Sequence, residues 1–120
     1  GGGSDIARGG GGSDTLKGNG GADNLNGGGA SDMLEGGNGN DTLKGGGGND
    51  FFSFKTGSGR DVIVDFAQGD TIMLTRGADE FSDLSITQQG SNVLIEFANV
   101  DILIRTDNVD NFQANDFMFT

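Results

Sequence analysis

The chain has 120 residues, a net charge of −11 at pH 7, 25 glycines, and no proline, cysteine or histidine. Without cysteine and histidine there are no disulfides and no zinc site built from thiolates or imidazoles, and without proline the glycine content is not that of collagen. A chain this acidic is not expected to bind nucleic-acid phosphates or anionic membranes. No apolar run reaches the roughly 18 residues of a membrane helix. Cations are the expected partners, and oxygen donors favour calcium or magnesium.

A nonapeptide repeat begins the chain. Its five full units span residues 9–17, 18–26, 27–35, 36–44 and 45–53. Each unit has aspartate at its sixth place and an apolar residue at its eighth, as in GGGGSDTLK. A partial unit with Asp5 and Ala7 precedes them, and after a two-residue insertion the unit 56–64 restores the pattern with Asp61 and Ile63. A solvated acidic tract does not keep aspartate and leucine in register through five units, so the pattern indicates a repeat architecture.

The composition changes near residue 51. Residues 1–50 hold 20 of the 25 glycines, whereas all nine phenylalanines lie at position 51 or later. The second half alternates apolar and polar residues over short runs, which predicts half-buried strands. The expected strands are Val62–Phe66, Thr71–Thr75, Leu84–Gln88, Val93–Phe97, Asp101–Arg105 and Asp116–Phe119. Residues 89–92 predict a hairpin turn. The chain therefore divides into a repeat region, residues 1–55, and a C-terminal cap of strands, residues 56–120.

The repeat units match the pattern GGxGxDxUx, where U is apolar. In this the chain resembles the RTX (repeats-in-toxin) family, whose repeats bind calcium in a parallel β-helix. The stretch TGSGRDVIVDF, followed by GDTIML, and the end of the chain, NDFMFT, are similar to the C-terminal tails of serralysin-type proteases, type I-secreted lipases and mannuronan C5-epimerases. The resemblance implies an all-β fold, a right-handed parallel β-roll in which two nonapeptides complete one coil, with a C-terminal β cap.

The resemblance also implies where calcium binds. Each ion lies between loops stacked on the same side of the roll, so repeats i and i+2 share it. The aspartates would stack in two rows, Asp5, Asp23 and Asp41 on one edge and Asp14, Asp32 and Asp50 on the other. This gives four ions, a fifth at Asp61, and about four to six in all. The family's other ligands are loop backbone carbonyls. The implied loop positions are Gly9, Gly10, Gly11, Gly12, Gly18, Asn19, Gly20, Gly21, Gly27, Gly28, Gly29, Ala30, Gly36, Gly37, Asn38, Gly39, Gly45, Gly46, Gly47 and Gly48.

The residue types suit this chemistry, with some departures. Calcium takes 6–8 oxygens from carboxylates and carbonyls, and a loop turns carbonyls inward where glycine permits a positive φ. Asn19 stands at a second place of the repeat and tolerates the left-handed region. Ala30 stands at a fourth place and strains its loop if that place needs a positive φ. Asp70 is counted among the metal ligands, although Asp65 and Asp70 are both also compatible with ordinary aspartates at a strand end or turn.

Catalysis is not expected, and no residue is assigned a catalytic role. The chain lacks histidine, cysteine and tyrosine, which removes the commonest general bases and several nucleophiles. The function that the resemblance implies is calcium-triggered folding of a secreted, extracellular and monomeric protein. Its partners are calcium and a type I secretion machinery. The three opening glycines fit a cut through a longer repeat array and show no signal peptide.

Two other functions are compatible with the sequence. The chain is alternatively a polysaccharide-binding module of a secreted enzyme such as an alginate epimerase, although its acidic surface disfavours an anionic polymer. It is also compatible with a spacer in a long adhesin. The strand-rich second half favours the end of an array over a spacer.

Overall fold

The computed structural model describes residues 3–55, 59–67, 69–75, 83–90, 92–97, 100–105 and 116–119. The strands are β1 Ile6–Arg8, β2 Thr15–Lys17, β3 Asn24–Asn26, β4 Met33–Glu35, β5 Thr42–Lys44, β6 Phe51–Lys55, β7 Arg60–Ile63, β8 Thr71–Thr75, β9 Ser85–Gln89, β10 Asn92–Phe97, β11 Val100–Arg105 and β12 Phe117–Phe119. None of the described residues belongs to a helix with the length and hydropathy needed to cross a membrane. The start of the unit 56–64, Ser91 of the expected turn and Thr120 lie outside the described residues.

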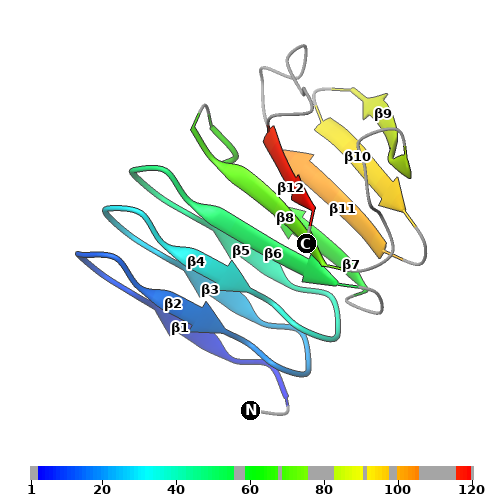
Figure 1. Ribbon diagram of the computed structural model, residues 1–120. Coiled ribbons are helices and arrows are strands. Elements are labelled where there is room, and N and C mark those ends of the chain that lie inside the picture. The colour runs from blue at the N-terminus through cyan, green and yellow to red at the C-terminus, as the bar shows by residue number, and fades with distance from the viewer. Residues whose placement is uncertain are drawn as a thin grey trace.

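The described strands form two sheets (Figure 1). The seven-stranded sheet has the order β1-β3-β5-β7-β11-β10-β9, and the five-stranded sheet has the order β12-β8-β6-β4-β2. Successive repeat strands alternate between the sheets, and each pairs in parallel with the strand two further along the chain. Two nonapeptides therefore complete one coil, and the all-β parallel β-roll expected from the resemblance is confirmed.

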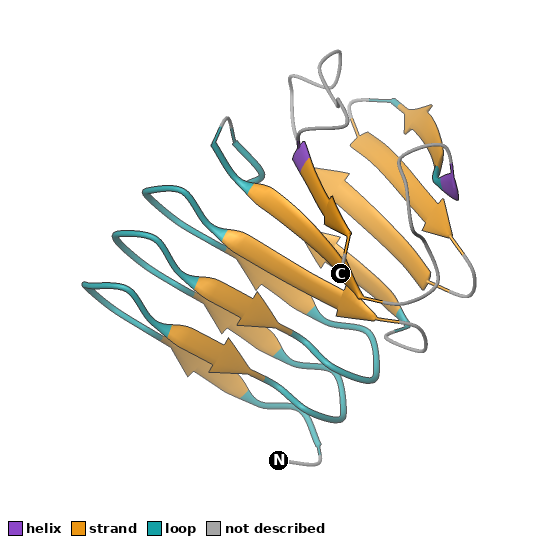
Figure 2. Cartoon of the chain, in the orientation of Figure 1, coloured by secondary structure: helices purple, strands orange, loops and turns teal. Residues whose placement is uncertain are grey.

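Strands β2 to β5 are each three residues long and direct their central residue inward. Leu16 pairs with Leu34 in one sheet, and Leu25 pairs with Leu43 in the other. Because alternate residues of a strand point to opposite faces, one leucine per strand enters the space between the sheets. Leu25, Leu34 and Leu43 are completely buried there. The glycine-rich segments form the loops at both edges of the coils (Figure 2).

The two-residue insertion lengthens β6 and leaves the roll intact. Phe52 and Phe54 both point into the core, with 0% and 2% of their surface exposed. An even insertion preserves the alternation of faces, whereas an odd one reverses it. The next strand of the same sheet, β8, pairs with β6 along its full length, from Phe51 opposite Thr71 to Lys55 opposite Thr75.

The cap continues the same two sheets. Strand β7 pairs in parallel with β5 on one side and with β11 on the other, and β11, β10 and β9 follow as antiparallel neighbours. Strand β12 pairs in parallel with β8. Residues 89 and 92 face each other across the expected hairpin turn, and Gly90 has a φ of 63°. The expected strand Val62–Phe66 is wrong in its bounds, since β7 spans Arg60–Ile63. The backbone N–H of Val64 still donates to the carbonyl of Leu43 at 3.0 Å, and the chain bends at that residue.

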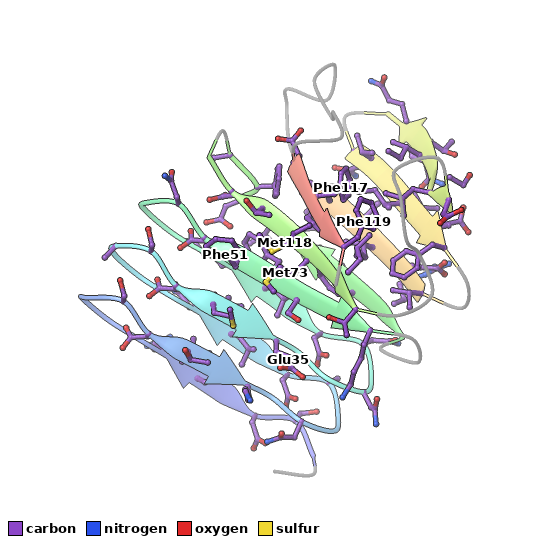
Figure 3. All side chains as sticks on the ribbon, viewed as in Figure 1. Glu35, Phe51, Met73, Phe117, Met118 and Phe119 are labelled. Atoms are coloured by element: carbon purple, nitrogen blue, oxygen red, sulfur yellow. The ribbon has the colours of Figure 1, made fainter. Side chains whose placement is uncertain are left out.

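Burial increases from the N-terminal coil towards the cap. Ile6 in β1 is 74% exposed, and Ala7 and Leu16 are only partly buried. In the cap, Ile95, Ile102 and Ile104 are fully buried and join one core with the repeat leucines. The outward face of the five-stranded sheet carries Phe51, Met73 and Met118, whereas Phe117 points inward (Figure 3). Among the described residues, the buried apolar side chains are thus concentrated at the cap end of the roll.

Candidate metal centre

The sixth-place aspartates form two hydrogen-bonded ladders, one along each edge of the roll. The first ladder comprises Asp5, Asp23, Asp41 and Asp61, and the second ladder comprises Asp14, Asp32, Asp50 and Asp70. In every step, the backbone N–H of one aspartate donates to the Oδ1 of the next at 2.8 or 2.9 Å. The steps are 18 residues within the repeats and 20 residues across the insertion. The two stacks that the resemblance implies are present, Asp61 continues the first stack as expected, and Asp70 continues the second.

Six of these aspartates have a second carboxylate oxygen that is buried and has no hydrogen-bond donor. This holds for the Oδ2 atoms of Asp14, Asp23, Asp32, Asp41, Asp50 and Asp61, all of which are buried. A buried anionic oxygen without a partner is costly, because burial removes its hydration and supplies nothing in return. A row of such atoms indicates that a positive charge is required along each ladder.

The protonation equilibria of the ladders reflect the same cost. Burial raises the pKa of Asp61 to about 8 and the pKa of Asp70 to about 6. Burial is also the main cause of the raised pKa of Asp41 and of Asp50. In each case the hydrogen bond from the preceding aspartate of the ladder lowers the pKa, and the charge of that same neighbour raises it. The carboxylates at the cap end therefore resist ionisation unless a cation binds them.

The first-place glycines line the space that the Oδ2 atoms face. A Cβ added to Gly9 would lie 2.5 Å from Asp14 Oδ2 and 2.7 Å from the carbonyl oxygen of Gly27. Gly18 and Gly27 have the same surroundings, with the carbonyl oxygen of the next coil at 2.7 and 2.8 Å and the Oδ2 of their own repeat closer still. No side chain fits at this place. Carboxylate and carbonyl oxygens are the donors that calcium binds.

The second and fourth places of the repeat adopt a positive φ. Among the glycines, φ is 88° at Gly10, 87° at Gly12, 96° at Gly28 and 92° at Gly37. Asn19 at a second place has a φ of 75°, as its tolerance of the left-handed region allows. Ala30 at a fourth place has a φ of 67°, so the strain expected from its Cβ is present.

The third place of the repeat has no such requirement. Gly11, Gly20, Gly29 and Gly47 have no positive φ and would accept a Cβ without contact. One repeat has Asn38 there instead. The N–H groups of Gly29, Asn38 and Gly47 donate to second-place carbonyls of the preceding loop on the same side, at 2.7–2.9 Å. The second-place carbonyls that accept these bonds hold the loops together.

The carboxylates lie singly along each ladder. Over the described ranges, no three histidine, cysteine, aspartate or glutamate side chains come together in a group that holds a metal by side chains alone. A cation between two loops must therefore take most of its oxygens from backbone carbonyls. That donor set fits calcium, which accepts carbonyl oxygens readily, better than it fits zinc.

Sequence reasoning left Asp65 undecided between a ligand and an ordinary turn residue, and the structure gives it other partners. Its Oδ1 accepts the N–H of Gly45 at 2.9 Å, and its Oδ2 accepts the N–H of Gly46 at 2.7 Å. Asp70 stands in the second ladder, but its Oδ2 accepts the N–H of Ala67 at 2.9 Å. The sequence does mark Asp65 as unusual, because it stands at the first place of the unit 65–73, where the five full repeats have glycine.

The fold and the ladders define a parallel β-roll with a repeated acidic loop. The family model of the RTX calcium-binding nonapeptide repeat matches the chain over residues 1–34, 26–63 and 53–81. These segments cover residues 1–81 of 120, and the chain belongs to this family of RTX calcium-binding repeat proteins. No curated protein sequence matches the chain.

Solved structures show the same fold. The extracellular lipase LipA of Serratia marcescens matches with a TM-score of 0.80 and 25% identity, over all of this chain and 20% of the lipase. Two subunits of the mannuronan C5-epimerase of Azotobacter vinelandii match with TM-scores of 0.68 and 0.71 and identities of 23% and 24%. They cover 95% and 98% of this chain and 91% and 80% of their own lengths. The chain thus spans a fifth of the lipase and most of each epimerase subunit.

Proposed function

We propose that the two aspartate ladders bind calcium between stacked loops, and that this binding folds the repeat region after export from the cell. The observation that carries the proposal is the row of buried aspartate Oδ2 atoms without donors, beside the loop carbonyls of the next coil. The aspartates of both ladders and the first-place carbonyls are the proposed ligands. The bound cation supplies the charge that these oxygens lack. On this basis about four to six ions bind per chain.

The proposed switch follows from calcium affinity. Extracellular calcium modules bind at about 10⁻⁴–10⁻³ M, whereas cytosolic sensors respond at about 10⁻⁷–10⁻⁵ M. Sites of the extracellular kind stay empty in the cytosol, so the chain remains unfolded, as passage through a narrow secretion channel requires. Outside the cell, binding free energy becomes folding free energy. About five divalent ions also offset most of the net charge of −11, which reduces self-repulsion of the folded chain.

Calcium-dependent folding is the first prediction. In chelator, circular dichroism is expected to show a mostly unfolded repeat region, because the buried carboxylates repel one another and lack a cation. Millimolar calcium is expected to raise the β signal cooperatively. Magnesium at the same concentration is the control and is expected to fail, because it gives up its hydration shell reluctantly. A fully formed β spectrum in chelator would contradict the proposal. The chain has no tryptophan or tyrosine, so intrinsic fluorescence is not a suitable probe.

Export is the second prediction. The chain ends in an acidic residue followed by apolar residues, Asp116 to Phe119, as type I secretion tails do in the family it resembles. A chain lacking its last 15 residues is expected to stay inside a host that carries a type I system, even with all repeats present. The matched control is a chain of full length with Asp32→Ala, which retains the tail. Normal secretion of the truncated chain would place the signal elsewhere.

A polysaccharide-binding role is the second candidate, and one surface feature favours it. An open groove of about 370 Å³ runs along the loop edge of the five-stranded sheet. It is lined by Asn19, Gly20, Glu35, Gly37, Asn38 and Lys55. Amides with one acid and one ammonium group suit sugar hydroxyls. Calorimetry with neutral and anionic oligosaccharides at saturating calcium distinguishes the roles. Heat of binding that is lost in Lys55→Ala supports this role, and absence of heat eliminates it.

A further inference from the structure

The structure assigns to Asp65 the role of an internal anchor for the loop that precedes Asp50. We infer that its carboxylate holds the segment Gly45–Asp50 in the folded form without a cation, so that calcium binding starts at this end of the roll. The inference rests on the proposed function, since it names the residue that positions the first cation-binding loop.

The hydrogen bonds of Asp65 set this loop apart from its equivalents. The N–H groups of Gly9, Gly18 and Gly27 each donate to a backbone carbonyl of the next coil on the same side, at 2.9 Å. At Gly45 a carboxylate oxygen replaces that carbonyl, and the adjacent N–H of Gly46 binds the other oxygen of the same carboxylate at 2.7 Å. Hydrogen bonds from N–H to a carboxylate are shorter and about twice as strong as neutral ones. The loop at Gly45 is therefore held more firmly by protein groups than the loops at Gly9, Gly18 and Gly27.

The position of Asp65 in the repeat explains how a side chain fits there. At the first place of a full repeat, a Cβ would collide with the Oδ2 of that repeat's aspartate, as at Gly18 and Gly27. In the unit of Asp65, the corresponding oxygen is engaged elsewhere, since Asp70 Oδ2 accepts the N–H of Ala67 at 2.9 Å. Asp70 still accepts the N–H of Asp50 through Oδ1 at 2.9 Å. The last described loop of the second ladder is thus closed by hydrogen bonds within the protein.

This arrangement has a consequence for the order of folding. A cation binds well only to a loop that is already stacked on its neighbour, so the first loop pair is the hardest to form. Asp65 orders the Gly45–Asp50 loop against the cap, where the buried apolar residues are concentrated. The proposed calcium site between the loops of Asp32 and Asp50 then has one of its two loops ordered before calcium binds. The anchor therefore makes this site the first one to bind calcium.

Hydrogen exchange of the full chain in chelator tests the inference directly. The amides of Gly45 and Gly46 are expected to be protected, whereas those of Gly9 and Gly27, whose acceptors are carbonyls of coils that need calcium, exchange at the rate of an unfolded chain. Equal exchange at Gly45 and Gly27 would overturn the inference. This measurement needs no substitution, so it holds even if a variant at position 65 does not fold.

Calcium titration of variants by circular dichroism is the second arm. Losing two charge-assisted hydrogen bonds changes a folding equilibrium by one to two orders of magnitude. Because about four ions share that change, Asp65→Ala is expected to raise the calcium midpoint about two- to threefold. Asp65→Asn retains one acceptor oxygen and is expected to lie between Asp65→Ala and the parent chain. The control is Asp101→Ala, which removes an exposed ion pair with Arg60 whose N–O distance is 3.4 Å.

The outcomes separate the anchor from the proposed function. A shift in Asp65→Ala no larger than that in Asp101→Ala overturns the anchor, even though calcium still folds the chain. A parent chain whose fold does not depend on calcium overturns the proposed function. In that case Gly45 and Gly46 would be no more protected in chelator than Gly9 and Gly27, and the order of folding inferred here would fail as well.

Discussion

At the scale of single residues, the repeat assigns a separate requirement to each place. The first place excludes a side chain because carboxylate and carbonyl oxygens surround it, and the second and fourth places need a positive φ. The third place has neither requirement, which agrees with Asn38 standing there. Glycine is therefore needed for space at one place and for backbone conformation at two others. A test at Ala30 follows from these differences.

Ala30→Gly is expected to stabilise the calcium-bound chain. Ala30 has a φ of 67°, and a Cβ in the left-handed region costs about 1–2 kcal/mol. Glycine removes that strain, offset in part by its greater freedom in the unfolded chain, so a net gain of about 0.5–1 kcal/mol is expected. The measurement is thermal melting at saturating calcium. Ala22→Gly is the matched control, because Ala22 is an exposed loop residue without a positive φ and should lose stability. A loss of stability in both variants would contradict the strain.

Asp32→Ala is expected to raise the calcium midpoint more than Asp14→Ala. Asp32 accepts the N–H of Asp14 and donates its own N–H to Asp50, so it adjoins two intervals of the second ladder. Within the described residues, Asp14 has a ladder partner only on the side of Asp32. Calcium titrations of both variants by circular dichroism measure the difference. Equal midpoints would argue against ions shared between repeats two apart.

At the scale of elements, the repeat strands depend on their neighbours. A strand of three residues buries one side chain well and leaves its other two at the surface, as β4 does with Leu34 between Met33 and Glu35. Such strands are too short to pair stably alone, and their stability comes from stacking. Strand β6 shows how the architecture tolerates change. Its two added residues place Phe54 in the core beside Phe52, because the side-chain period of a strand is two.

At the scale of the whole molecule, the repeat region and the cap contribute different forces. The burial of about one leucine per nonapeptide does not offset the cost of ordering nine residues. Cations between loops are proposed to make up the difference in the repeat region. The cap instead has fully buried isoleucines at positions 95, 102 and 104 and pairs directly with the repeat strands through β5 and β7. The cap is therefore the surface on which the first coil is expected to order.

The fragment 1–55 is expected to stay unfolded at calcium concentrations that fold the full chain. It lacks the cap strands, and it also lacks Asp61, Asp65 and Asp70, which bind the backbone N–H groups of its last loops. Circular dichroism of the fragment, titrated with calcium beside the full chain, measures this. A common midpoint would show that the cap is unnecessary. The division of the chain at residue 55 remains a prediction until the two parts are compared in this way.

The sequence, through its resemblance to the RTX family, determined the roll and both aspartate ladders within the repeats. A period of nine residues, with two units to a coil, places residues 18 apart above one another, so the stacks of Asp32 on Asp14 and of Leu34 on Leu16 follow from counting. Only the tertiary structure decided what happens where the period breaks. It continued the ladders across steps of 20 residues, to Asp61 as the resemblance implied and to Asp70, and it gave Asp65 to the amides of Gly45 and Gly46. These contacts depend on how the longer β6 and the loop after β7 pack together. The repeat register marks Asp65 as a departure, but the amides that it binds belong to another coil, and only the packing of the coils decides which amides those are.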